Sequence, residues 1–428
     1  MSAPSSPAPP SPSFRRAIDQ ILSSFDSISE WQDIIAFLSR LQKTISTHAT
    51  GQLRDIPKKL IISKRLAQCL NPALPAGIHQ KTLDVYHLIF STIGPAGMSK
   101  DLGIYSFGLF PFLQHAQMSL KPMLLTIYAD FYAKLDRRVL RPPLFGLILA
   151  LLPGLDEEGN EFFDRVLGIL DSLSRQVGQG YFFECIWLVL VKVSHLRNAA
   201  LAYLLKRMPK FTSGEEIAVV LGDETGLLAS ALCATLGDKQ VLVQRNCLEL
   251  LLVVFERIHL EAIVKAMLEV VLRKDMSLNR RLYAWLNSSR GLSSDPEVQD
   301  VLVCAAKSLF TNQHTISATL DTIPEISRPY KILISLLDRA EVGNMILDHA
   351  FIDILQSLQD RVSVTTDPDL RAEIVQNGNM FMEMVDPFVV GCHFFRLFHD
   401  REGPVDVNSM KLVLFFVQEC SSDDEETR

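Results

Sequence analysis

The sequence predicts an all-α protein, built as a HEAT- or armadillo-like α-solenoid of stacked helical pairs. Apolar residues recur at helical spacing through most of the 428 residues. Leu and Ala together outnumber Val, Thr and Tyr, which favours helices over strands. Short segments far apart in the chain also resemble one another, as expected of a repeat protein.

The helical pattern is clearest near the N-terminus, where Trp31, Ile34, Leu38, Leu41 and Ile45 form one apolar stripe. Similar stripes occupy residues 58–70, 78–92, 120–135, 160–177, 182–208, 241–256, 276–286 and 327–357. Turn-forming pairs such as Gly94-Pro95 and Pro153-Gly154 separate several of them. We therefore expect helices joined by short breaks from Phe14 to about Val417.

Internal similarity favours stacked repeats. Gln80–Phe90 and Arg245–Phe255 both begin with polar residues, continue with a Leu and an acid, and end in an apolar run. Asn279–Leu286 has a comparable basic start and apolar continuation. Because one helical pair cannot bury its own apolar face, such pairs stack. An irregular helical bundle is the alternative.

Charge is distributed unevenly along the chain. Residues 1–145 hold 16 Lys and Arg against 9 Asp and Glu, whereas residues 146–428 hold 26 against 40. A basic front end on a chain of net charge −7 indicates an anionic partner such as a membrane surface. Nucleic acid is disfavoured because the basic residues are not interleaved with aromatic ones and the pI is low.

Cysteine usage and apolar run length indicate the compartment. The seven Cys form no CxxC pair, so we expect free core thiols and a reducing, cytoplasmic location. The apolar runs at 144–152 and 185–191 are shorter than the roughly 20 residues of a membrane span and predict buried helices. Residues 1–13, rich in Pro and Ser, and the acidic residues 421–428 are expected to be disordered.

Longer strings resemble the N-terminal domain of the Dopey family. They are Ile56–Pro75, Tyr105–Pro111, Ser119–Pro122, Leu151–Leu155, Val241–Arg245 and Arg273–Leu286. We accordingly expect a Dopey-like helical solenoid over residues 14–310 and a helical continuation of it over 311–420. Family members are several times longer than this chain and have a C-terminal region that is absent here.

The resemblance implies a non-enzymatic scaffold or adaptor in membrane traffic between endosomes and the Golgi. Such a protein is peripheral on trans-Golgi network and endosome membranes, recruited by anionic, phosphoinositide-bearing lipid and by partner proteins. The implied partners are an Arf-exchange-factor-like scaffold of the Mon-two type, an aminophospholipid flippase, kinesin light chain and membranes containing phosphatidylinositol 4-phosphate. The alternative is a pure protein–protein adaptor with no direct lipid binding.

The first candidate site is a basic helix that would bind anionic lipid through Arg54, Lys58, Lys59, Lys64 and Arg65. Ile62, Leu66, Cys69 and Leu70 form the expected buried stripe of this helix. Helical geometry places Lys58 and Arg65 on one flank of the stripe, and Lys64 nearly opposite to it. Lys59 falls within the stripe but in the first turn, from which it can reach water. The alternative is an ordinary solvated helix face.

The second candidate site is a set of basic residues that would bind a partner's carboxylates: Arg273, Lys274, Arg280 and Arg281. Asp275 or Ser277 is expected to cap the helix on which the last two lie. The alternative is pairing of these residues with Asp or Glu of neighbouring repeats.

The sequence matches known calcium-binding and other metal-binding patterns poorly. Asp156, Glu158 and Asn160 imitate a calcium loop that lacks its Gly and its final Glu, which is typical of an acidic helix start. Cys392-His393 with His399 lies among Phe residues that indicate a core helix. We therefore expect no catalytic residue, no metal and no cofactor.

Overall fold

The computed structural model describes residues 10–27, 30–48, 55–208, 225–254, 261–286, 296–311, 323–399 and 407–420. Every regular element within these ranges is a helix, which confirms the predicted all-α class. The chain divides into two compact units, Met1–Leu228 and Ala229–Arg428. Each unit has its own core and is described by itself.

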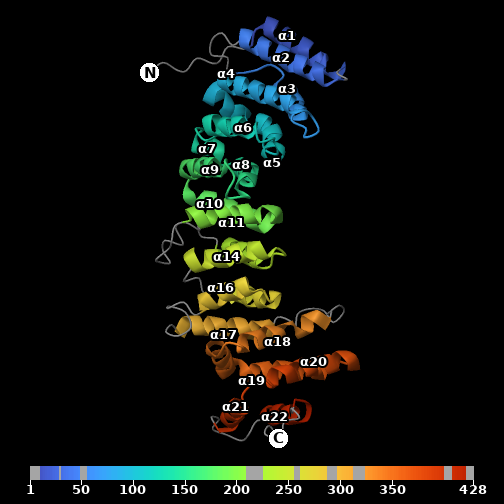
Figure 1. Cartoon of the computed structure of the whole chain (residues 1–428), viewed down its shortest axis with the longest axis vertical. Helices are drawn as coiled ribbons and strands as arrows, with labels where there is room; N and C mark the ends of the chain where they lie inside the picture. Colours follow the sequence, from blue (N-terminus) through green and yellow to red (C-terminus); the bar gives the residue numbers. More distant parts are fainter. Residues whose placement is uncertain are drawn as a thin grey trace. The chain divides into compact units, whose positions relative to one another are not determined.

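Unit 1 is a succession of helices in chain order (Figure 1). They are α1 (Pro12–Ser23), α2 (Trp31–His48), α3 (Lys59–Cys69), α4 (Ala76–Leu109), α5 (Phe112–His115), α6 (Lys121–Ile127), α7 (Arg137–Leu140), α8 (Leu144–Leu151), α9 (Phe163–Val177), α10 (Gln179–Lys192) and α11 (Arg197–Arg207), with the short turns η1 (Phe25–Ser27), η2 (Tyr128–Tyr132), η3 (Leu152–Leu155) and η4 (Ser194–Leu196). Helix α1 packs on α2, and both α2 and α3 pack on α4.

Local sequence explains where several helices begin and end. Helix α1 begins at Pro12, before the expected Phe14, because the Ser11 hydroxyl accepts a hydrogen bond from the Phe14 amide at 3.2 Å and Pro12 suits the first helical position. Helix α4 is interrupted at Gly94, whose φ of 62° only a glycine adopts readily. This interruption is the break predicted at Gly94-Pro95.

Two predicted stripes are each divided between two helices. The stripe at 182–208 is broken after Lys192, and the stripe at 327–357 is broken after Leu337. Neither break contains Gly or Pro, and the apolar periodicity continues across both. The sequence therefore contains no indication that a helix ends there.

An aromatic cluster fills the core of unit 1 beneath α3. Tyr86, Phe90 and Tyr105 of α4 are fully buried, as are Tyr128 and Tyr132 of η2. The Tyr128 hydroxyl donates to the Leu109 carbonyl at 2.9 Å, and the ring centroids of Tyr128 and Tyr132 lie 5.3 Å apart, edge to face. These contacts hold both halves of α4 in place, and α3 packs against them.

Unit 2 shows the packing expected of stacked helical pairs. It begins within α13 (Thr225–Leu236) and contains α14 (Val241–Val254), α15 (Glu261–Glu269), η5 (Val270–Arg273), α16 (Met276–Leu286), α17 (Pro296–Thr311), α18 (Ile323–Leu337), α19 (Ala340–Val364), α20 (Pro368–Met382), α21 (Pro387–His399) and α22 (Val407–Glu419).

Four helices of unit 2 pack on the next helix but one: α14 on α16, α15 on α17, α17 on α19, and α18 on α20. Figure 1 shows these helices as successive layers. Contacts between elements two apart are what a solenoid produces, because each pair covers the apolar face of its neighbour. The predicted solenoid architecture is confirmed.

The apolar runs at 144–152 and 185–191 form parts of α8 and α10, most of whose side chains are buried. No single helix in the described ranges is long and apolar enough to cross a membrane. By length and composition alone, one pair would qualify together, Gln179–Lys192 with Ser194–Arg207, which is bent by 119°.

Candidate functional site

Helix α3 presents the face that its sequence predicts. Ile62, Leu66 and Cys69 are buried against α4, and Lys64 is exposed. Lys58 differs from the prediction, because it lies just before the helix with a left-handed φ of 56° and is not part of its flank. Arg54 lies outside the described residues.

Lys59 is partly buried and forms two ion pairs. Its Nζ lies 2.7 Å from Oδ1 of Asp101 in α4 and 3.1 Å from Oδ1 of Asp55. The Asp101 side chain is only 5% exposed and that of Lys59 is 31% exposed. The hydrogen bond to Asp101 raises the pKa of Lys59 above its ordinary value of 10.5. The ammonium therefore neutralises a buried carboxylate and reaches water only in part.

The two flanking cations also have acidic partners within unit 1. Lys58 Nζ lies 3.7 Å from Asp19 of α1, and the Arg65 guanidinium donates to Asp26 of η1. The same guanidinium lies 4.5 Å from the centroid of the Phe25 ring. These contacts connect the region of α3 to α1 and η1.

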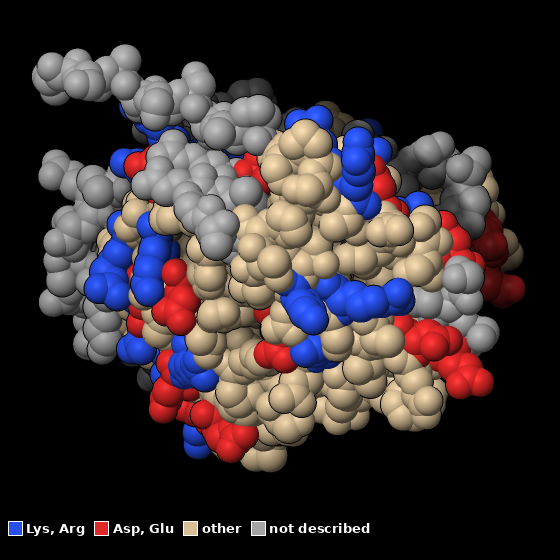
Figure 2. Space-filling model, turned by 90° about the horizontal axis from the view of Figure 1, so that it is seen from above, with Lys and Arg blue, Asp and Glu red and all other residues tan. Residues whose placement is uncertain are grey.

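The charges around α3 balance. Four described cations, Lys58, Lys59, Lys64 and Arg65, stand against four paired carboxylates, Asp19, Asp26, Asp55 and Asp101. Figure 2 likewise shows acidic side chains interspersed among the basic ones on the face it displays. The attraction of an anionic leaflet for this surface is correspondingly weakened, because it depends on an excess of positive charge.

Two of the four basic residues of the second candidate site support the fold of unit 2. Arg281 Nε donates to Oε2 of Glu249 in α14 at 2.8 Å, and Arg273 Nη2 donates to the Asp238 carbonyl at 2.8 Å. Asp275 caps α16 as predicted, accepting from the amides of Ser277 and Leu278 at 2.8 and 3.1 Å. Arg281 thus pairs with an acid of a neighbouring helix, whereas Arg273 binds a backbone carbonyl.

The other two basic residues line a cleft of about 1180 Å³. Lys274 and Arg280 are exposed there, together with Arg339, which directly precedes α19. The Arg339 guanidinium lies 5.0 Å from the centroid of the Tyr283 ring, and Asp338 contributes the one carboxylate among the described lining residues. Three cations in one cleft can receive carboxylates or phosphates of a partner.

Sequence reasoning missed Arg339. It lies 59 positions after Arg280, and no local pattern joins the two. Arg339 approaches Tyr283 of α16 only through the packing of helices that are far apart in the sequence.

The residues considered for chemistry are engaged in structural contacts. Glu158 pairs with Lys206 of α11, and Asn160 accepts from the Phe162 amide at 3.1 Å just before α9. Burial raises the pKa of Asp156. His393 is buried and stacks on Phe351 at 5.1 Å, and burial lowers its pKa. Within the described ranges, no three His, Cys, Asp or Glu are placed to hold a metal ion.

Comparison with protein families finds two matching models that together cover most of the chain. The model described as Dopey, N-terminal matches residues 10–291, and the DOP1 middle TPR domain matches residues 302–427. Both descriptions agree with the helical architecture seen here.

Related proteins share the similarity over most of this chain. Protein DOP1B of Xenopus laevis is 35% identical over 407 residues, covering 87% of this chain and 18% of its own length. The DOP1 homolog of Drosophila melanogaster is 34% identical over 422 residues, covering 92% and 16%. Protein DOP1 of Saccharomyces cerevisiae is 25% identical over 476 residues, covering 94% and 27%.

The chain thus spans between about a sixth and about a quarter of the length of these relatives. The crystal structure of SYS-1 superposes with a TM-score of 0.31 at 12% identity, which is too low to support an argument.

Proposed function

Because the chain belongs to the Dopey family, we propose that it is a non-enzymatic scaffold in membrane traffic between endosomes and the Golgi. It acts on the cytoplasmic side of trans-Golgi network and endosome membranes. Its proposed partners are an Arf-exchange-factor-like scaffold of the Mon-two type, an aminophospholipid flippase and kinesin light chain. These partners are proposed for the whole protein, of which this chain has the length of a part.

The charges around α3 bear on whether the protein binds lipid directly or attaches to the membrane through partner proteins. Lys58, Lys59 and Arg65 are each paired with at least one carboxylate, which reduces the net attraction of this surface for phosphatidylinositol 4-phosphate. By contrast, the side chains of Lys274, Arg280 and Arg339 are exposed, and Asp338 is the single acidic residue among the described residues that line their cleft. These features support a protein–protein adaptor whose membrane attachment is supplied mainly by its partners.

Direct lipid binding is the second candidate. It is supported by the excess of basic residues in positions 1–145 and by exposed Lys64, which has no ion-pair partner among the described residues. It would add to the adaptor role, since a solenoid has room for several ligands.

The experiment compares flotation and capture by the same purified chain. Flotation is measured with liposomes that contain phosphatidylinositol 4-phosphate in a neutral lipid background. Capture is measured with the purified Mon-two-type scaffold. We expect capture, weakened about tenfold by Arg280→Glu/Arg339→Glu through charge repulsion, and little flotation in either protein.

The double variant Lys58→Glu/Arg65→Glu separates the candidates. Strong, salt-sensitive flotation that this variant abolishes would favour direct lipid contact at α3 over the adaptor. Absence of capture by the wild-type chain would contradict the adaptor role. Circular dichroism spectra that match the wild type show that each variant is folded.

A further inference from the structure

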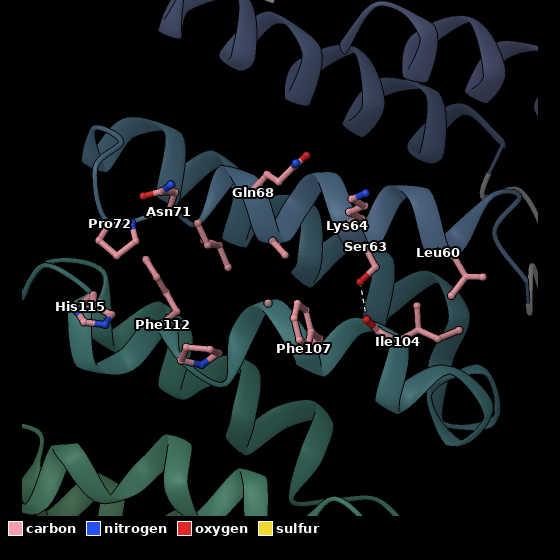
Figure 3. A pocket seen from close by; sticks show the side chains of 14 residues that line it. Leu60, Ser63, Lys64, Gln68, Asn71, Pro72, Ile104, Phe107, Phe112 and His115 are labelled. Carbon is pink, nitrogen blue, oxygen red and sulfur yellow. Dashed lines mark hydrogen bonds between the residues drawn. The ribbon is translucent and has the colours of Figure 1, made fainter. Parts of the chain in front are cut away.

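A groove of about 680 Å³ runs between α3 and the second half of α4 in unit 1. Figure 3 shows α3 along one side and α4 with α5 along the other. Its floor is formed by Ser63 and Ala67 of α3 and by Ile104 and Gly108 of α4. The Ser63 hydroxyl donates to the Ile104 carbonyl, which fixes the register of the two helices.

Small residues set the shape of the groove. At Gly108 an added Cβ would lie 2.8 Å from the Ala67 Cβ and 2.7 Å from the Tyr86 hydroxyl, so the helices approach as closely as a glycine allows. Ser63, Ala67 and Gly108 add little bulk to the floor, and the exposed apolar side chains of Leu60 and Phe107 lie beside it. The groove is therefore built into the helix crossing.

The walls expose large apolar side chains. Leu60 of α3 is 68% exposed, and Phe107 of α4 is 78% exposed. Both line the groove, together with Ile104, Pro111 and Phe112. Exposed apolar side chains gathered along a groove are typical of a surface that a partner covers.

The described residues that line this apolar surface include a basic side chain and no acidic one. None of the described residues that line the groove is Asp or Glu, whereas Lys64 lies on its α3 wall. Lys100 is exposed one turn before Ile104 on the same face of α4. An occupant that complements these walls has apolar side chains for the floor and carboxylates for the rim.

We propose that this groove binds an amphipathic helix of a partner protein, with apolar residues along one face and Asp or Glu along its edge. The lining residues of α3 run from Leu60 to Gln68, a rise of about 12 Å, which matches about two turns of a bound helix. Its apolar residues would be spaced i, i+4 and i+7. The inference rests on the proposed function only in treating the chain as a binding scaffold.

A membrane is the less favoured occupant of the same groove. An anionic leaflet would meet Lys64, but it would also meet the carboxylates that pair with the remaining cations around α3. A narrow helical ligand would contact Lys64, which lines the groove, whereas neither Asp19 nor Asp26 is among the described lining residues.

The experiment is a selection from a display library of random 16-residue peptides on the wild-type chain. The counter-selection uses the folded variant Leu60→Asp/Phe107→Asp. We expect peptides with apolar residues at i, i+4 and i+7 and neighbouring Asp or Glu. A synthetic peptide of that consensus should bind Leu60→Asp or Phe107→Asp at least about tenfold more weakly, as for a buried hot-spot contact.

Matched controls lie on neighbouring exposed positions. Ile61→Asp changes the adjacent exposed residue of α3 that does not line the groove, and it should leave affinity unchanged. Lys64→Glu should weaken the acidic peptide and favour its Lys-substituted counterpart, whereas Lys43→Glu on α2 should do neither.

Three outcomes would overturn the proposal: no enrichment over the counter-selection, enriched peptides without the amphipathic pattern, or a consensus peptide that binds the two groove variants normally. Binding of phosphatidylserine vesicles that is lost in Leu60→Asp/Phe107→Asp, without peptide binding, would assign the groove to a membrane. Because the assay uses purified chain and peptides, its result is independent of the trafficking role and of capture through the unit 2 cleft.

Discussion

The Lys59 ammonium of α3 lies 2.7 Å from the buried carboxylate of Asp101 in α4. This ion pair joins the two helices that form the groove, beside the turn that contains Leu60. Asp101 has little access to water, so its charge depends on Lys59 for compensation.

Replacing Lys59 by Met should lower the free energy of unfolding of unit 1 by about 2 kcal/mol, because it leaves the Asp101 carboxylate buried without its partner. The partial exposure of Lys59 keeps this value below that of a fully buried pair. Urea unfolding followed by circular dichroism measures the change. Lys58→Met, which breaks the exposed pair with Asp19, should cost less than about 0.5 kcal/mol. Equal effects of the two variants would contradict the assigned role of Asp101.

The stabilisation by Lys59 should fade at alkaline pH. Its pKa is raised in the folded chain, chiefly by the hydrogen bond to Asp101, above the ordinary value of 10.5. The stabilisation that Lys59 provides is therefore fully present below the pKa of Lys59 in the unfolded chain. It is lost as the pH rises through the pKa of Lys59 in the folded chain.

The measurement is the difference in unfolding free energy between wild type and Lys59→Met across pH. It should be constant from about pH 7 to about pH 10 and shrink above that range. Ionisation of the buried tyrosines destabilises both proteins and cancels in the difference. A difference that grows with pH would show that another group is responsible.

Two glycines of the second half of α4 should respond oppositely to alanine. Gly108→Ala places a Cβ 2.8 Å from the Ala67 Cβ and should destabilise the chain by about 1–3 kcal/mol through overpacking. Gly103→Ala meets no atom within 4 Å and should stabilise it by about 0.5–1 kcal/mol, because alanine is the better helix former. Thermal unfolding of both variants tests this, and stabilisation by Gly108→Ala would contradict the close helix crossing.

Removing the acids that neutralise α3 should create lipid affinity. Asp19→Asn/Asp26→Asn frees Lys58 and Arg65 and adds two positive charges in effect, each worth about 1 kcal/mol near an anionic leaflet. Flotation with liposomes containing phosphatidylinositol 4-phosphate should rise about tenfold or more and fall again with added salt.

The matched control is Asp33→Asn/Asp164→Asn, which removes the same charge from exposed positions on α2 and α9. It should change flotation much less. Equal gains in the two double variants would mean that total charge, and not the pairing around α3, governs lipid binding.

Much of the fold could be predicted because its signals are local. The stripe of Ile62, Leu66 and Cys69 predicted the buried face of α3, and Gly94-Pro95 predicted the break in α4. The capping role of Asp275 follows from residues two and three positions away. The breaks near Val193 and Asp338 were missed, because neither contains a residue that prevents a helix from continuing.

By itself, the sequence determined the helical class, the stacking of pairs and the Dopey resemblance, because periodicity, capping and characteristic strings lie within short stretches of chain. Only the tertiary structure decided which basic side chains near α3 remain free to contact a ligand. Arg65 meets Asp26 39 positions away, and Lys59 meets Asp101 42 positions away, through the packing of α3 on its neighbours. The same packing leaves Lys64 exposed beside an apolar groove. Ala67 and Gly108 are in close contact in this groove, and the large side chains of Leu60 and Phe107 line it as well.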